Sequence, residues 1–376
     1  MTRLFLVAGE ASGDLHGALL ARALREVEPR IELSGVGGGR MAAEGVRLLA
    51  NADDLGVTGV WEVLRELPKF RRLLGRLGEH LERERPDGFV PIDYPDFNLR
   101  LAEKAHAAGI PIVYYISPQV WAWRRGRIAT LRRLVRRMIV IFPFEEEIFR
   151  AAGVPVSYVG HPLADRTRPR IERDEMRDSL GVGARDLLIA LLPGSRRGEI
   201  ERILPVLVET RERLVKENGL RWVLALAPGF REDDLPRVGR IDRAIAVRQG
   251  ETREILNACD LALTASGTAT IEAALLGTPM VVLYKMHPLT WFLARRLVRV
   301  PHVAMANLLA GERIVPEYLQ GEANATTLSA EVLRWVRDPS LRAATRVKLL
   351  AAAARLGPGG AVGRAARVIL DEVGDR

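Results

Sequence analysis

Short apolar runs alternate with longer amphipathic stretches over most of this chain. An apolar run at residues 3–9 predicts a strand, and residues 15–27 follow it with apolar side chains at helical spacing. Strand–helix alternation of this kind is typical of a parallel sheet that helices cover on both faces. The same succession predicts further strands at residues 32–37, 87–92, 111–117, 137–143 and 156–160.

The pattern lapses between about residues 162 and 173, which contain two prolines and four arginines, and then resumes. After residue 326 it is helical to the end of the chain. We therefore predict an α/β protein with two Rossmann-like domains facing across a cleft and a C-terminal helical tail. The predicted boundaries are 1–165 for the first domain, 166–345 for the second and 346–376 for the tail.

The composition agrees with this prediction and removes several classes of site. A chain of 376 residues with 48% hydrophobic and 27% charged residues can build two packed cores. Its single cysteine, Cys259, excludes an intrachain disulfide and a cysteine-rich metal site, and the histidines show no zinc-ligand spacing. Because an apolar strand follows Met1 so closely, we expect no signal peptide and a cytoplasmic protein. Residues 105–123 carry no charge, but prolines and a glycine interrupt them, so we expect no membrane span there.

The net charge is +9, from 56 Lys and Arg against 47 Asp and Glu. An excess of this size favours anionic partners, whether phosphates, nucleic acid or a phospholipid surface. A nucleic-acid-binding protein is the less favoured alternative, because no RNP, helix-turn-helix or zinc-finger pattern appears.

The loop after the first predicted strand is rich in glycine and serine. Such a loop, containing Glu10 and Ser12, presents backbone N–H groups and a helix start to an oxyanion or a hydroxyl. The same residues equally permit a tight turn with Ser12 or Asp14 as the helix cap. The glycines do not form a GxGxxG motif, and at residues 35–40 arginine replaces its last glycine, which disfavours a nicotinamide dehydrogenase.

Two carboxylates follow another predicted strand, at Asp93 and Asp96. A carboxylate at the carboxyl end of a strand is suited to proton abstraction in a cleft. Asp96 comes directly after Pro95, so we expect it to cap or stiffen the first turn of the next helix. Asp93 precedes that helix and can project into the cleft, although it too can be a cap.

Two loops in the second half have the composition of phosphate sites. In the first, Gly194 and Ser195 permit close approach of a phosphate and Arg196 can donate to it. In the second, hydroxyls and a glycine suit a diphosphate, and a carboxylate one turn later can accept bonds from ribose hydroxyls; alternatively, the pattern is a capping box. Its residues are Ser266, Gly267, Thr268 and Glu272.

Seven short motifs, in order along the chain, resemble the signature of the lipid-A-disaccharide synthases. They are AGEASGD (8–14), IDYPDFN (92–98), SPQVWAW (117–123), GHP (160–162), LPGSR (192–196), ASGT (265–268) and NLLAG (307–311). The resemblance implies a two-domain GT-B glycosyltransferase that inverts the anomeric centre and needs no metal or other cofactor. It implies transfer of 2,3-diacylglucosamine from UDP-2,3-diacylglucosamine to 2,3-diacylglucosamine 1-phosphate, giving UDP and the β-1',6-linked lipid A disaccharide.

The resemblance also assigns roles to individual residues. Asp93 becomes the candidate general base, and Arg196 a catalytic arginine for the donor phosphate. Glu10, Ser12 and Asn307 are expected to line the substrate cleft. The nucleotide is expected to meet Gly194, Ser195, Ser266, Gly267, Thr268 and Glu272.

Acylated substrates imply contact with the inner face of the cytoplasmic membrane. Residues 60–74 mix large apolar side chains with cations, as an interfacial segment does, and Pro68 predicts two short pieces in place of one helix. The alternative is a buried apolar face opposite a solvated basic one. A UDP-sugar epimerase is the rival within this architecture, since it needs no acyl-binding surface. The oligomeric state stays open, a homodimer included.

Overall fold

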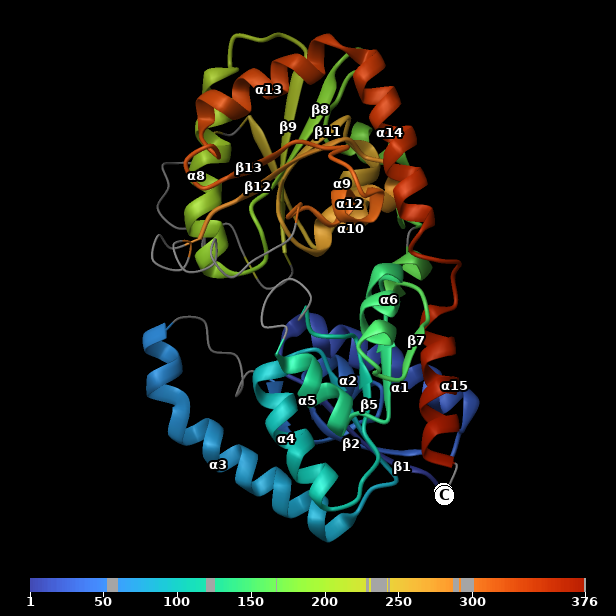
Figure 1. The fold of residues 1–376 in the computed structure, drawn as a ribbon. Coiled ribbons are helices and arrows are strands. Elements are labelled where there is room, and N and C mark those ends of the chain that lie inside the picture. Colours follow the sequence, from blue (N-terminus) through green and yellow to red (C-terminus); the bar gives the residue numbers. More distant parts are fainter. Residues whose placement is uncertain are drawn as a thin grey trace. The chain divides into compact units, whose positions relative to one another are not determined.

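The computed structural model describes residues 1–52, 60–119, 126–166, 168–227, 230, 242, 244–286, 291 and 301–374, with the backbone alone at residues 11, 60–67 and 166. The chain divides into two compact units. One comprises Met1–Asp165 together with Leu356–Arg376, and the other comprises Arg166–Arg355. The last helix of the chain is therefore part of the first unit (Figure 1).

The first unit is built on a parallel sheet with the strand order β3-β2-β1-β4-β5-β6-β7. In its centre, Val7 lies opposite Val36 on one side and Pro91 on the other. The predicted α/β class and parallel sheet are confirmed, and the edge strand β3 is one that the pattern did not predict. The strands are β1 (Arg3–Ala8), β2 (Glu32–Gly37), β3 (Arg47–Asn51), β4 (Gly88–Ile92), β5 (Val113–Tyr115), β6 (Arg137–Val140) and β7 (Val156–Tyr158).

Helices cover both faces of this sheet. Successive side chains of each strand point to opposite faces, so each strand contributes to the packing on both. Phe5 and Val7 share a core with Leu77, Phe97 and Leu131, which come from α3, α4 and α5. On the other face α1 packs against α15. The helices are α1 (Ala11–Val27), α2 (Gly39–Ala43), α3 (Val60–Glu84), α4 (Pro95–Ala107), α5 (Arg127–Leu134), α6 (Pro143–Ala151), the 3₁₀ helix η2 (Pro162–Arg166) and α15 (Ala361–Gly374).

The C-terminal helix α15 is held to the first unit by charge as well as by apolar packing. Glu372 accepts hydrogen bonds from Arg136 Nε at 2.9 Å and from Arg137 Nε at 2.6 Å. The buried residues of α15 fall at helical spacing and form the apolar face that the sequence pattern predicts. They are Ala361, Ala365, Ala366, Ile369 and Val373.

Helix α3 is continuous through Pro68, which corrects the prediction of two short pieces. Proline inside a helix costs about 3 kcal/mol, because one backbone hydrogen bond is lost and the ring crowds the preceding turn. Beyond Pro68, the side chains of Leu73, Leu77 and Leu81 are buried in the core. We infer that this packing offsets the cost of the proline. Figure 1 shows α3 running along the outside of α4.

The second unit has its own parallel sheet, with the strand order β10-β9-β8-β11-β12-β13. Its strands are β8 (Leu187–Leu192), β9 (Leu220–Leu226), β10 (Ile245–Gln249), β11 (Leu261–Ala265), β12 (Met280–Tyr284) and β13 (Glu317–Leu319). Its helices are α7 (Arg173–Ser179), α8 (Arg197–Arg213), α9 (Thr252–Ala258), α10 (Thr268–Leu276), α12 (Met305–Ala310), α13 (Ala325–Arg337) and α14 (Pro339–Ala354). The short edge strand β13 was not predicted from the pattern.

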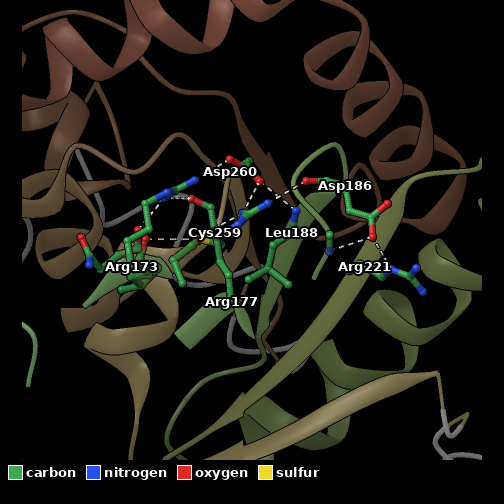
Figure 2. A network of polar contacts seen from close by, with 11 residues as sticks. Arg173, Arg177, Asp186, Leu188, Arg221, Cys259 and Asp260 are labelled. Atoms are coloured by element: carbon green, nitrogen blue, oxygen red, sulfur yellow. Dashed lines mark hydrogen bonds and ion pairs between the residues drawn. The ribbon is translucent and has the colours of Figure 1, made fainter. Parts of the chain in front are cut away.

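A polar network fastens α7 to the amino ends of the strands in this second sheet (Figure 2). Asp260 accepts bonds from Arg173 Nη2 at 2.7 Å and from Arg177 Nη1 at 2.9 Å, and also from the backbone N–H of Leu188 at 2.8 Å. The adjacent Cys259 is buried, and burial raises the pKa of its thiol to about 12, so it stays protonated at neutral pH. The network lies at the edge of the sheet opposite the candidate phosphate loops and serves stability.

Candidate active site

The loops after β1 and β4 lie side by side at the carboxyl edge of the first sheet. These strands are neighbours, with Ala8 opposite Ile92. A Cβ atom added at Gly9 would lie 2.3 Å from Cδ1 of Tyr94, so only glycine fits against this ring. Burial, together with the nearby carboxylate of Glu10, raises the pKa of Tyr94 to about 12. The fold therefore brings the Glu10 loop next to the Asp93 loop.

Asp93 is exposed and sits on a strained backbone. Its φ is 46° and that of Tyr94 is 49°, so two successive non-glycine residues occupy the left-handed region. Such residues cost on the order of 1–3 kcal/mol each and persist only where their surroundings hold them. Here the carbonyl oxygen of Asp93 accepts bonds from Asn98 Nδ2 and from Tyr114 Oη, each at 2.7 Å. Both donors come from fully buried side chains. The carboxylate predicted to be the base is thus presented outward from a backbone fixed on its inner side.

Asp96 lies in the first turn of α4 and forms an ion pair with Arg127. This agrees with the expectation that it stabilises the helix start, although Pro95 occupies the first position and no side chain caps the helix. Of the two carboxylates, Asp93 stays the one predicted to act as a base.

The carboxylate of Asp14 closes a neighbouring loop. It accepts bonds from the backbone N–H groups of Gly38 at 2.7 Å, Arg40 at 3.2 Å and Met41 at 3.1 Å. Asp14 therefore caps α2, whereas the sequence allowed it as the cap of its own helix, α1. The glycine-rich loop at 35–40 thus receives an internal carboxylate where a phosphate would bind in a dinucleotide site. Ser12 lies exposed in the first turn of α1, whose N-cap is Glu10.

The sequence pattern assigned no role to two buried polar residues near this edge, Ser117 and His161. Ser117 donates to Glu145 at 2.6 Å and fixes the start of the SPQ loop, whose residues 120–125 lie outside the described part of the chain. His161 of the GHP motif accepts a hydrogen bond from the N–H of Leu163. Burial, and to a smaller extent the nearby His16, lowers the pKa of His161 to about 3. The motifs mark both positions, but burial became visible only in the fold.

In the second unit, the loop after β8 folds around Glu199. This carboxylate accepts bonds from the N–H groups of Ser195 at 3.2 Å and Arg196 at 3.4 Å. Gly194 has a φ of 115°, and a Cβ atom there would lie 2.6 Å from Glu199 Oε2. The guanidinium side chain of Arg196 is 55% exposed, so it can reach an anion in solvent.

The loop after β11 starts α10 with Gly267 as its N-cap. Gly267 and Thr268 are exposed, and among the described residues no heavy atom from outside this turn lies within 4 Å of a Cβ position built on Gly267. Ser266 donates to the carbonyl oxygen of Val303 at 3.3 Å. Glu272 lies 3.9 Å from Arg253 Nε of α9 and does not form the alternative capping box, because the N-cap of α10 makes no side-chain bond.

Asn307 is fully buried and its amide is saturated by the protein. Its Nδ2 donates to the carbonyl of Val315 at 2.9 Å and to Glu317 Oε1 at 2.7 Å. Its Oδ1 accepts from the N–H groups of Ile314 at 2.8 Å and Val315 at 2.9 Å. An asparagine has two donors and two acceptor lone pairs, and all four are used here. Direct contact of Asn307 with a substrate, which stays a prediction, requires one of these bonds to break.

Among the described residues, no group of three or more His, Cys, Asp and Glu side chains is placed to hold a metal ion. Of the helices in the described part of the chain, none combines the length and apolar character that crossing a membrane requires.

The two parallel-sheet units define an α/β protein of the GT-B class, and solved structures share this fold. A UDP-GlcNAc 2-epimerase from Neisseria meningitidis bound to UDP-GlcNAc has a TM-score of 0.62 at 12% identity, covering 100% of this chain and 99% of that one. Anabaena Alr3699/HepE in complex with UDP and glucose has a TM-score of 0.59 at 15% identity, covering 100% of both chains. At such identities the likeness establishes the fold alone.

The family is established by sequence. The model of the family described as lipid-A-disaccharide synthetase matches residues 4–354. The lipid-A-disaccharide synthase of Geobacter sulfurreducens is 43% identical over 374 residues, which is 99% of this chain and 97% of that protein. The synthase of Myxococcus xanthus is also 43% identical, over 98% of this chain and 97% of its own length. The chain belongs to the lipid-A-disaccharide synthetase family and is a glycosyltransferase of lipid A biosynthesis, as its motifs predicted.

Proposed function

We propose that this protein transfers 2,3-diacylglucosamine from UDP to the 6-hydroxyl of 2,3-diacylglucosamine 1-phosphate. The reaction forms the β-1',6 disaccharide and releases UDP. The single observation that carries the chemistry is the exposed Asp93 carboxylate, whose strained backbone is held by Asn98 and Tyr114. Family membership supplies the substrate class.

In this mechanism Asp93 removes the proton of the acceptor hydroxyl as its oxygen attacks the anomeric carbon. The bond from that carbon to the UDP oxygen breaks on the opposite face, so the configuration is inverted. We propose that Arg196 and the backbone N–H groups at the start of α10 stabilise the negative charge of the departing diphosphate. Glu10 and Ser12 are proposed to orient the acceptor, because the Glu10 loop contacts the Asp93 loop through Gly9 and Tyr94.

The nucleotide is assigned to the second unit. The space that the described residues leave open at Gly267, together with the exposed Thr268, suits close approach of a diphosphate. Gly194 and Ser195 are proposed to complete the phosphate site, and Glu272 to accept bonds from the ribose. The likeness of the fold to solved structures that hold UDP supports a UDP-sugar donor.

We further propose that the enzyme works at the inner face of the cytoplasmic membrane, on anionic lipid. Part of the predicted membrane segment is already used by the core: Leu73 is buried, and Phe70 packs edge-on against Phe97 with ring centroids 5.0 Å apart. The proposal therefore narrows to residues 60–67, which include Trp61 and Leu64 and whose side chains lie outside the described part of the chain.

The deciding experiment incubates the purified chain with UDP-2,3-diacylglucosamine and 2,3-diacylglucosamine 1-phosphate and separates the lipids by thin-layer chromatography. We expect a disaccharide that forms in the presence of EDTA and requires both substrates. An altered UDP-sugar without disaccharide would instead support the epimerase alternative. Hydrolysis of the donor alone would contradict the proposed acceptor site.

A further inference from the structure

We propose that Glu317 is a positioning residue for binding of the UDP-sugar donor. It holds Val303, whose carbonyl oxygen accepts a hydrogen bond from Ser266 in the loop after β11, called the nucleotide loop below. The proposal rests on the function proposed above and adds a residue from outside the recognised motifs. Glu317 is the first residue of the edge strand β13, and the sequence pattern assigned it no role.

The carboxylate of Glu317 accepts three hydrogen bonds from one turn of chain. Oε2 accepts from the N–H of Val303 at 3.0 Å, and Oε1 accepts from the N–H of Ala304 at 2.8 Å. Oε1 also accepts from Nδ2 of Asn307 at 2.7 Å. Ala304 is the N-cap of α12, so the carboxylate sits where the first amides of this short helix point. All three partners are donors, and the two carboxylate oxygens have enough lone pairs to accept from each of them.

Val303 connects this carboxylate to the nucleotide loop. Its N–H is bound by Glu317 and its carbonyl oxygen accepts the hydroxyl of Ser266. One peptide segment is thus held on one side by an edge strand and on the other by the loop that follows β11. The backbone N–H of Ser266 is itself fixed by the carbonyl of Leu283, at 3.0 Å. The orientation of the serine side chain therefore depends on where Glu317 holds Val303.

This arrangement decides what Ser266 can offer a ligand. Its proton is committed to Val303, so its lone pairs remain for a donor such as a ribose hydroxyl or a base N–H. If Val303 shifts, the proton is released and the side chain is free to rotate. We therefore expect Glu317 to act on the affinity for UDP, with little effect on the chemical step that Asp93 performs.

The test measures UDP binding by calorimetry in the full-length chain and compares Glu317→Gln with Glu322→Gln. Glutamine has the size of glutamate but turns an NH₂ group toward N–H donors. Glu322 is exposed, lies three residues after the end of β13 and serves as the control. Loss of the hydrogen bond that Ser266 is proposed to make to UDP corresponds to an affinity about two- to tenfold weaker, so E317Q should bind UDP more weakly by that factor while E322Q is unchanged. The KM for the UDP-sugar should rise by a similar factor and kcat should change much less.

A purely structural role predicts a different result. In that case E317Q would melt at a lower temperature but bind UDP as the wild type does, and the proposal would be overturned. If E317Q does not fold, Glu317→Asp decides, because it keeps the charge and shortens the reach: weaker UDP binding supports the proposal and wild-type affinity overturns it. Failure of the proposed reaction is separate, since it appears as a wild-type chain that binds UDP without forming disaccharide.

Discussion

The side-chain amide of Asn98 donates to the main-chain carbonyl of Asp93 at 2.7 Å, five residues back along the chain. The same Nδ2 lies 3.3 Å from the carbonyl oxygen of Val7 and 3.4 Å from that of Ile92. A single buried amide therefore connects the ends of β1 and β4 to the residue proposed as the base. This relationship separates what holds Asp93 in place from what Asp93 does, and the two can be tested separately.

We expect Asp93→Ala to fold normally and to lose turnover. A positioned general base contributes about 10²–10⁴-fold to a rate, so disaccharide formation should fall by that range. Affinity for UDP should change little, because the nucleotide is assigned to other loops. Turnover close to that of the wild type would place the base elsewhere and leave Asp93 as a turn residue only.

Substitutions of two neighbouring tyrosines test the hydrogen bond that Tyr114 donates to the carbonyl oxygen of Asp93. Tyr114→Phe removes the hydroxyl that donates to Asp93 O and should lower the free energy of unfolding by about 0.5–1.5 kcal/mol, with reduced kcat. Tyr115→Phe is the control, because its hydroxyl is buried without a hydrogen-bond partner among the described residues. The control should be neutral or stabilising in chemical denaturation and should keep its kcat. Equal effects of the two substitutions would show that the hydrogen bond from Tyr114 does not position Asp93.

Glu272→Ala should weaken UDP binding measured by calorimetry. A hydrogen bond to a charged group is worth about 1.5–3 kcal/mol, which is the loss expected if the carboxylate accepts from a ribose hydroxyl. Arg253→Ala provides a comparison, since Arg253 lies 3.9 Å from Glu272. If both variants melt at lower temperature and bind UDP normally, Glu272 serves the packing of α9 against α10 and not the nucleotide.

Stability should fall in mild acid because His161 is buried in its neutral form. Its pKa is lowered to about 3 in the folded state, from 6.5, so the unfolded chain binds a proton over that interval and the folded chain does not. Unfolding therefore becomes easier as the pH falls from about 6.5 toward 3, by at most about 1.4 kcal/mol per pH unit for this one group. His161→Asn retains an acceptor for the N–H of Leu163 and should flatten the dependence of melting temperature on pH between 4.5 and 6.5. An unchanged slope would assign the acid sensitivity to other groups.

The membrane proposal is tested by replacing Trp61 and Leu64 together with serine. We expect the double variant to fold, to bind UDP and to co-sediment less with anionic vesicles, because each large apolar side chain contributes roughly 1.5–3 kcal/mol when buried. Leu73→Ser is the contrasting change: Leu73 is buried in the core, so it should lower stability without a specific effect on vesicle binding. Unfolding of the double variant would place those side chains in the core as well.

Much of the architecture was determined by local pattern in the sequence. Apolar runs such as residues 3–9 and the amphipathic stretches between them predicted parallel sheets, and each candidate loop was found at a carboxyl end of a strand. Burial on both faces requires a continuous apolar run, and this requirement is visible in the sequence itself. The edge strands β3 and β13 were missed because they are short and half-buried and begin with the charged residues Arg47 and Glu317, so neither is a continuous apolar run.

Only the tertiary structure decided which polar groups meet. Asp14 caps α2, and Glu317 accepts a hydrogen bond from Val303. The side-chain amide of Asn307 forms its hydrogen bonds with residues seven to ten positions further along the chain. Pro68 is tolerated inside α3 because leucines beyond it are buried against distant strands and helices. A hydrogen bond requires two atoms within about 3 Å in the right direction. For residues far apart in sequence that geometry follows from the packed fold, and the identity of either residue does not reveal its partner.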